Sequence, residues 1–185
     1  MYWSTGTPYW NNTAQIHVRN IDYERLQYGY IQYTTDLNGD QIIDLLVTVN
    51  DEYNGSLAIY ELPPSGHLLT GKFVKHIIAS GFKPSSAGRG RGAPGQGVPV
   101  QVYSLAGRKK PIILLSGDDD GGIYLIEALH DNDPQDWQYN TTKIHQCTGT
   151  AGQISVEDVD SDLHLELFIP CYNEGVFYIY RLMGN

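Results

Sequence analysis

Three times along the chain, two short apolar runs flank a turn rich in Asn, Asp and Gly. The copies span residues 46–60, 113–126 and 167–180. Apolar runs of this length are typical of strands, and Gly and Asn supply the positive φ that tight hairpins need. Each copy is therefore predicted to be a β-hairpin, and the chain as a whole is predicted to be built from repeated β units.

Further strand-like segments accompany each hairpin, so each unit is expected to hold four strands. Four-stranded units that recur as cassettes are typical of β-propeller blades rather than of a sandwich. The predicted fold is all-β, a β-propeller with about three and a half four-stranded blades. The expected blades are residues 24–80, 97–146 and 148–183, with residues 1–23 as the outer strand of a preceding blade.

The composition agrees with this prediction. The chain of 185 residues contains 14 Tyr, 3 Trp and 20 Gly and shows no helix-length amphipathic period. Its length fits one domain, residues 1–185.

The N-terminal segment repeats a pattern found much later in the chain. Trp10 and residues 13–17, Thr-Ala-Gln-Ile-His, resemble Trp137 and residues 141–145, Thr-Thr-Lys-Ile-His. A partial ring of blades leaves open edges that favour pairing with another chain. We expect either a piece of a larger propeller or closure by self-association, as in a dimer of about seven blades.

Two acidic loops, residues 36–44 and 158–166, each precede an apolar strand. Oxygen-bearing side chains stand at loop positions 1, 3, 5 and 9, and position 7 offers a backbone carbonyl. Calcium takes six to eight oxygen ligands in such loops, so Ca²⁺ is the predicted cofactor. The side chains are Asp36, Asn38, Asp40 and Asp44 in the first loop and Asp158, Asp160, Asp162 and Glu166 in the second, with carbonyls from Ile42 and His164.

The first loop, followed by Leu-Leu-Val and then Asn-Gly-x-Leu-x-Ile-Tyr, resembles the FG-GAP or VCBS repeat. This is the calcium-loop blade of integrin α-subunit propellers and of many secreted proteins. The resemblance covers residues 29–62 and 152–182 well, and the middle unit only through its hairpin. It implies an integrin-like propeller in which the two sets of loop residues named above are calcium ligands.

The sequence departs from the repeat pattern at several loop positions. The usual glycine at position 6 is Gln41 or Leu163, and Ser161 replaces the glycine at position 4. If these positions need positive φ, a side chain there is strained, so the second loop is predicted to be the weaker site.

The middle unit has no ligands at the matching positions, and its basic run is expected to be solvated or to face an acidic loop. The positions are Ser104, Ala106, Arg108 and Ile112, and the basic run is Arg108, Lys109 and Lys110.

Charge and hydropathy exclude two classes of partner. The net charge of −9 and a pI near 4.9 argue against nucleic acid. No run approaches the ~18 apolar residues that membrane insertion needs.

The Gly- and Pro-rich segment 81–97 carries Arg89 and Arg91 and is a candidate binding loop for an anionic glycan, or else a linker. The acidic turn 118–120 is expected to be solvated.

Two features are compatible with an extracellular or secreted location. Cys147 and Cys171 are predicted either to form a disulfide or to be buried thiols. Glycosylation sequons begin at Asn11, Asn54 and Asn140. The first residues show no secretion signal.

No catalytic constellation stands out. The six His residues are scattered, and none lies beside a nucleophile motif. The favoured function is a calcium-binding, non-catalytic propeller module of an extracellular or cell-surface glycoprotein that binds a protein or glycan or has a structural role. Its other partners would be further copies or the remainder of a propeller. The alternative is a fragment of a propeller-type carbohydrate-active enzyme, such as a polysaccharide lyase or sugar dehydratase.

Overall fold

The computed structural model describes residues 2–4, 16–24, 28–64, 67, 70–86, 88–101 and 109–183. In these ranges the regular elements are β-strands and single turns of 3-10 helix, and all strand pairs are antiparallel. The prediction of an all-β fold is therefore confirmed. No helix in the described part is long and apolar enough to cross a bilayer.

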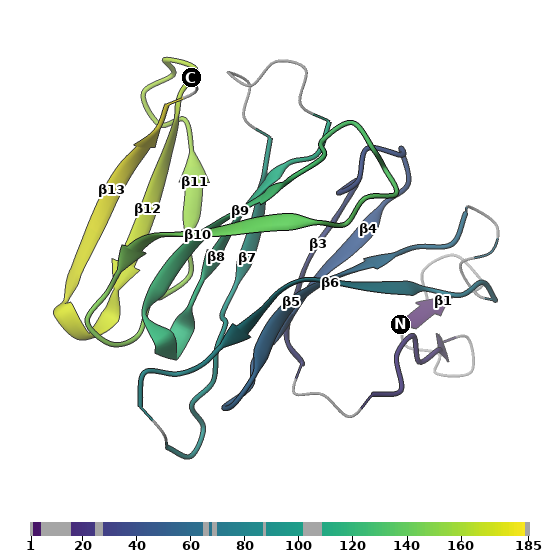
Figure 1. The fold of residues 1–185 in the computed structure, drawn as a ribbon, viewed down its shortest axis with the longest axis horizontal. Helices are drawn as coiled ribbons and strands as arrows, with labels where there is room; N and C mark the ends of the chain where they lie inside the picture. The colour runs from purple at the N-terminus through teal and green to yellow at the C-terminus, as the bar shows by residue number, and fades with distance from the viewer. Residues whose placement is uncertain are drawn as a thin grey trace.

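Three sheets lie side by side, and in each one the strands follow chain order (Figure 1). The first sheet contains β3 (Tyr28–Thr35), β4 (Asp44–Val49), β5 (Gly55–Glu61) and β6 (Val74–Phe82). The second contains β7 (Gly97–Val100), β8 (Ile112–Ser116), β9 (Gly122–Ala128) and β10 (Tyr139–Gln146). The third contains β11 (Ser155–Glu157), β12 (Leu165–Cys171) and β13 (Val176–Leu182).

The remaining elements are short. β1 (Tyr2–Ser4) pairs with β2 (Ile16–Val18) beside the first sheet (Figure 1). The 3-10 turns η2 (Asp118–Asp120) and η3 (Tyr172–Glu174) close the hairpins of the second and third sheets.

The three predicted hairpins correspond to β4–β5, β8–β9 and β12–β13. Four strands per unit is correct for the first two sheets, whereas the third has three strands among the described residues. The left-handed glycine after η3, Gly175, occupies the same place in its hairpin as Gly121 after η2.

Apolar side chains of β8 point alternately to the two neighbouring sheets, because successive residues of a strand face opposite sides. Ile113 and Leu115 pack in one core cluster with Leu46 and Ile59 of the first sheet. The intervening β8 residues, Ile112 and Leu114, pack in a second cluster with Leu167 and Ile169 of the third sheet. The middle sheet is therefore covered on both faces, which explains why β8 reads as a continuous apolar run.

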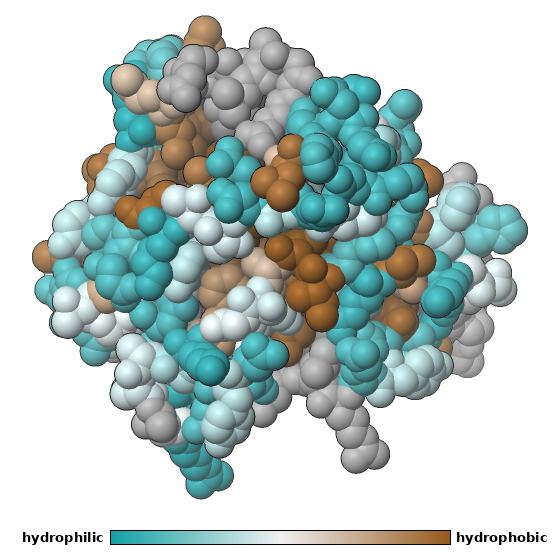
Figure 2. Space-filling view, viewed as in Figure 1, coloured by the Kyte–Doolittle hydropathy of each residue, from teal (hydrophilic) through white to brown (hydrophobic). Residues whose placement is uncertain are grey.

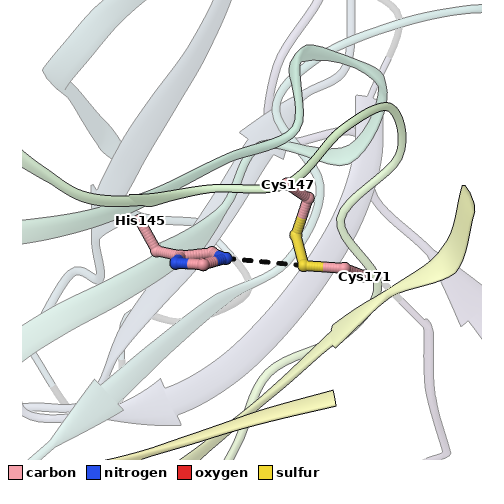
Figure 3. A group of neighbouring side chains, drawn as sticks. All are labelled: His145, Cys147 and Cys171. Carbon is pink, nitrogen blue, oxygen red and sulfur yellow. Dashed lines mark hydrogen bonds between the residues drawn. A yellow bond between two sulfur atoms is a disulfide. The ribbon is translucent and has the colours of Figure 1, made fainter. Parts of the chain in front are cut away.

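A disulfide joins Cys147 to Cys171, so of the two alternatives for these cysteines the structure contains the bridge. Cys147 follows β10 and Cys171 ends β12, which means that the bridge links the second sheet to the third. The Nε2 atom of His145 lies 3.5 Å from Cys171 Sγ (Figure 3). Because the two sulfur atoms are bonded to each other, the cluster of His145, Cys147 and Cys171 offers no thiolate to a metal ion.

Replacing both cysteines by alanine is expected to lower the free energy of unfolding by about 3 kcal/mol, because the bridge limits the entropy of the unfolded chain. Urea denaturation followed by tryptophan fluorescence measures the change. An unchanged denaturation midpoint would show that the bridge does not contribute to stability.

Candidate metal-binding loops

The first acidic loop connects β3 to β4 and is organised by its first carboxylate. Asp36 accepts hydrogen bonds from the backbone N–H groups of Gly39 at 2.6 Å, Asp40 at 3.2 Å and Gln41 at 2.9 Å. Asn38 Oδ1 accepts a further bond from the Asp40 N–H at 3.0 Å. These short-range bonds are of the Asx-turn type and hold the loop in a tight curve.

The second loop, which connects β11 to β12, repeats this pattern. Asp158 accepts bonds from the N–H groups of Asp162 at 3.1 Å and Leu163 at 3.0 Å, at the same two loop positions as Asp40 and Gln41. The two loops therefore share one backbone design despite their different sequences.

Backbone angles support the same equivalence. At loop position 4, φ is +84° for Gly39 and +62° for Ser161, and at position 6 it is +71° for both Gln41 and Leu163. Positive φ is costly for a residue with a side chain. The residues that replace the usual glycines therefore lie at strained positions. The second loop has two such residues, Ser161 and Leu163, and the first loop has one, Gln41.

The last carboxyl of the first loop is buried and only partly hydrogen-bonded. Asp44 has no exposed surface. Its Oδ2 accepts a bond from the Leu37 N–H at 3.0 Å, whereas its Oδ1 has no hydrogen-bond partner. Burial raises the pKa of Asp44 to about 7, and the charges of Asp40, Asp36 and Glu61 add to the effect. A buried carboxylate oxygen without a partner is costly, and a bound cation would remove that cost.

In the second loop, three of the four predicted side-chain ligands converge. Asp158, Asp160 and Glu166 each place one oxygen within 4.8 Å of the others. Two oxygens bound to one Ca²⁺ at 2.3–2.6 Å lie at most about 5 Å apart, so this spacing suits a single ion. Glu166 also accepts a bond from the Val159 N–H at 3.1 Å, as Asp44 does from Leu37.

The fourth predicted ligand, Asp162, is engaged by basic groups. It forms an ion pair with Arg181, and its Oδ1 lies 3.2 Å from Nδ1 of His164. The Nε atom of Arg181 is also 4.0 Å from Glu166 Oε1. This arginine is a residue of the site that sequence reasoning missed, because it lies on β13, outside the loop motif.

In the first sheet an acidic residue, Glu61, occupies the position that Arg181 occupies in the third sheet. Arg181 pairs with Glu166 across β12 and β13. In the first sheet Leu45 pairs with Tyr60, which sets Glu61 beside Asp44. The first loop is therefore flanked by an extra carboxylate and the second by an arginine.

The predicted carbonyl ligands occupy equivalent places. The N–H groups of Ile42 and His164 each donate to the aspartate two residues earlier, at 2.7 Å to Asp40 and 3.0 Å to Asp162. Both residues therefore share the local turn that the ligand pattern requires.

In the corresponding region of the middle sheet, Ser104, Ala106 and Arg108 lie outside the described residues, and Ile112 is buried in the core. Of the two alternatives expected for Lys110, solvation is wrong, because its side chain is fully buried. Lys110 instead faces the acidic segment that contains Asp131, Asp133 and Asp136. Its ammonium donates to the Asp136 carbonyl and lies 6.0 Å from the centroid of the Trp137 ring. Burial lowers the pKa of Lys110, while neighbouring aspartates oppose the shift.

The proposed arginine loop is fastened to both neighbouring hairpin turns. Arg91 lies 3.5 Å from Asp119, which also accepts a bond from the Gly92 N–H at 3.1 Å. Ala93 exchanges two backbone hydrogen bonds with Asp51. Both arginines are exposed, and Arg91 is in addition paired with Asp119.

The acidic turn 118–120 is not simply solvated, contrary to expectation. Asp118 accepts a bond from the Asn50 side chain at 3.1 Å, and Asp120 accepts one from the Tyr124 hydroxyl at 2.8 Å. Burial raises the pKa of both carboxyls. The turn forms η2 and connects the first and second sheets.

Two of the three sequons can be located. Asn54, in the turn between β4 and β5, and Asn140, on β10, are both exposed. Asn11 lies outside the described residues.

One surface hollow gathers groups that an enzyme would use. A hollow of about 590 Å³ is lined by Lys83, Asp120, Tyr124 and Lys143 among other residues. Burial and the bond to Asp120 raise the pKa of Tyr124 above its usual range. A tyrosine that resists deprotonation is poorly suited to act as a general base.

Searches against protein-family models, curated proteins and solved structures found no match to this chain. The geometry of the loops is therefore the basis for the function proposed below.

The raised pKa of Asp118 predicts a pH-dependent stability difference. The folded state binds this proton more tightly than the unfolded chain, whose reference pKa is 3.8. The stabilisation by the proton is complete below that value and is lost as pH rises through the folded pKa. Asp118→Asn should therefore gain stability relative to wild type as pH rises from about 4 to about 7. Urea denaturation in chelator at several pH values tests this, and a difference independent of pH would contradict it.

Proposed function

We propose that the chain is a calcium-binding, non-catalytic β-propeller module of an extracellular or cell-surface protein. Its role would be to present loops to a protein or glycan, or to act as a structural unit. The propeller interpretation is supported by antiparallel sheets that lie side by side with their strands in chain order. It is also supported by two equivalent loops that each connect the first and second strands of a sheet.

The unpartnered Oδ1 atom of Asp44 carries the calcium proposal. Such an atom, fully buried at the end of a loop with two further carboxylates, needs a positive charge nearby. The donors are oxygens of carboxylates, an amide and backbone carbonyls, which suit a hard cation. Ca²⁺ is favoured over Mg²⁺ because it accepts more protein oxygens and a less regular geometry.

Metal in the first loop would also stabilise a junction between sheets. Gly39 packs against the second sheet's neighbouring segment, since a methyl group there would lie 3.2 Å from Lys109 Cβ. The Tyr139 hydroxyl lies 3.5 Å from the Leu37 carbonyl oxygen, to which it donates. The loop therefore contacts the next sheet, so fixing its shape would fix that contact.

Calcium is expected to raise the melting temperature relative to protein in chelator. At 100 times the Kd, one site adds about 2.7 kcal/mol, which corresponds to a rise of roughly 5–10 °C for a chain of this size. Differential scanning calorimetry with CaCl₂ and with EDTA measures the shift.

Matched variants locate the effect. Asp44→Asn should reduce the shift, and combining it with Asp158→Asn should abolish it. Glu52→Gln removes one charge at the far end of the β4–β5 hairpin and should leave the shift intact. A wild-type protein that shows neither a melting shift nor binding heat with calcium would refute the proposal.

The two sites should differ in affinity because of Arg181. Arg181→Gln should tighten the second site about two- to fivefold, the range expected for one exposed ion pair. Isothermal titration with CaCl₂ in the Asp44→Asn background isolates this site. Lys83→Gln removes the same charge at a distant position and serves as the control. Equal affinities with and without Arg181 would show that the arginine does not compete with the ion.

A further inference from the structure

The edge of the third sheet is an apolar strand without a cover. β13 pairs with β12 on one side, and none of the described residues pairs with its other side. Phe177 and Ile179 are each 61% exposed. Figure 2 shows apolar atoms at the surface over this sheet, at the left of the view. Proteins usually protect such edges with charges, proline or short strands, so an uncovered apolar edge indicates a partner.

In the second sheet the equivalent strand is covered. The Tyr124 hydroxyl donates to Asp120, four residues earlier, and the Tyr178 hydroxyl donates to Glu174 in the same way. Left-handed Gly121 and Gly175 occupy the same place in the two turns. β13 is therefore the counterpart of β9, and no strand among the described residues takes the place of β10 in the third sheet.

The chain carries one strand, β2, that resembles β10 in sequence but lies outside the three main sheets. Residues 13–17 share Thr, Ile and His with residues 141–145 of β10. β2 contains Ile16 and His17 and pairs with the three-residue strand β1. In the chain, β2 comes directly before the first sheet, just as β6 comes directly before the second sheet and β10 directly before the third.

We infer that β2 of a second copy of this chain pairs antiparallel with β13 and completes the third sheet. The same contact made in return closes a two-fold dimer in which each copy donates one strand. Within one chain β2 lies beside the first sheet, at the opposite end of the row from β13 (Figure 1). The donated strand therefore comes from another molecule.

The observed pairing of β10 with β9 sets the expected register. His145 pairs with Ile123, and Ile123 corresponds to Phe177 in the third sheet. His17 of the donor is therefore placed opposite Phe177. In the donor copy the first sheet follows β2 along the chain. Pairing of β2 with β13 therefore brings the donor's first sheet towards the face of the receiving copy's third sheet that carries Phe168 and Ile179. This arrangement uses no metal ligand and is expected with and without calcium.

Sedimentation equilibrium of the full chain tests the inference, in calcium and in EDTA. Wild type should have twice the chain mass of 20.7 kDa in both buffers. Ile179→Lys should be monomeric, because a charge on the edge opposes strand addition. Leu129→Lys is the control, since Leu129 is 56% exposed directly after β9, in the second sheet, which supplies neither the donated strand nor the receiving edge, and this variant should stay dimeric. A monomeric wild type would overturn the inference.

A second pair of measurements identifies the donated strand. His17→Pro should yield a folded monomer, because proline removes a donor from the ladder. A mixture of His17→Cys and Phe177→Cys chains should form a covalent heterodimer under oxidation. A dimer that survives His17→Pro, or a mixture that forms no cross-link, would refute β2 donation even if the protein is dimeric. Loss of calcium binding would leave both results unchanged, so the two proposals fail independently.

Discussion

The alternation of side chains in the middle sheet holds the described structure together. β8 supplies Ile113 and Leu115 to one core cluster and Ile112 and Leu114 to the other. The first sheet also buries its opposite face, in a separate cluster that contains Leu45, Val47 and Phe73, whereas β13 of the third sheet is exposed along most of its length. The position of each loop then follows from how the outer sheets pack against this central one.

The two acidic loops show how one backbone design can serve two electrostatic settings. Asp36 and Asp158 both accept hydrogen bonds from the N–H groups at loop positions 5 and 6, and the φ signs at positions 4 and 6 are the same in the two loops. What differs is the residue across the strand pair, Glu61 in one sheet and Arg181 in the other. Local sequence fixes the shape of the loop, and the neighbouring strand tunes its charge.

The sequence predicted what depends on local pattern. Hairpins followed from apolar runs and turn glycines, and loop shape followed from the spacing of Asp and Asn. The burial of Lys110 could not be predicted, because it depends on Trp137 and the Asp136 carbonyl meeting it in three dimensions. The same holds for Arg181, which reaches the second loop from another strand, and for Arg91, whose partner lies 28 positions away in the chain.

The two joints between the sheets are made differently. An apolar core lies at both joints; Cys147 and Cys171 add a covalent bond between the second and third sheets, and hydrogen bonds around Asp118 and Asp119 add to the contact between the first and second. In an oxidising medium the second and third sheets therefore cannot separate fully without breaking a covalent bond, whereas the described contacts between the first and second sheets are non-covalent.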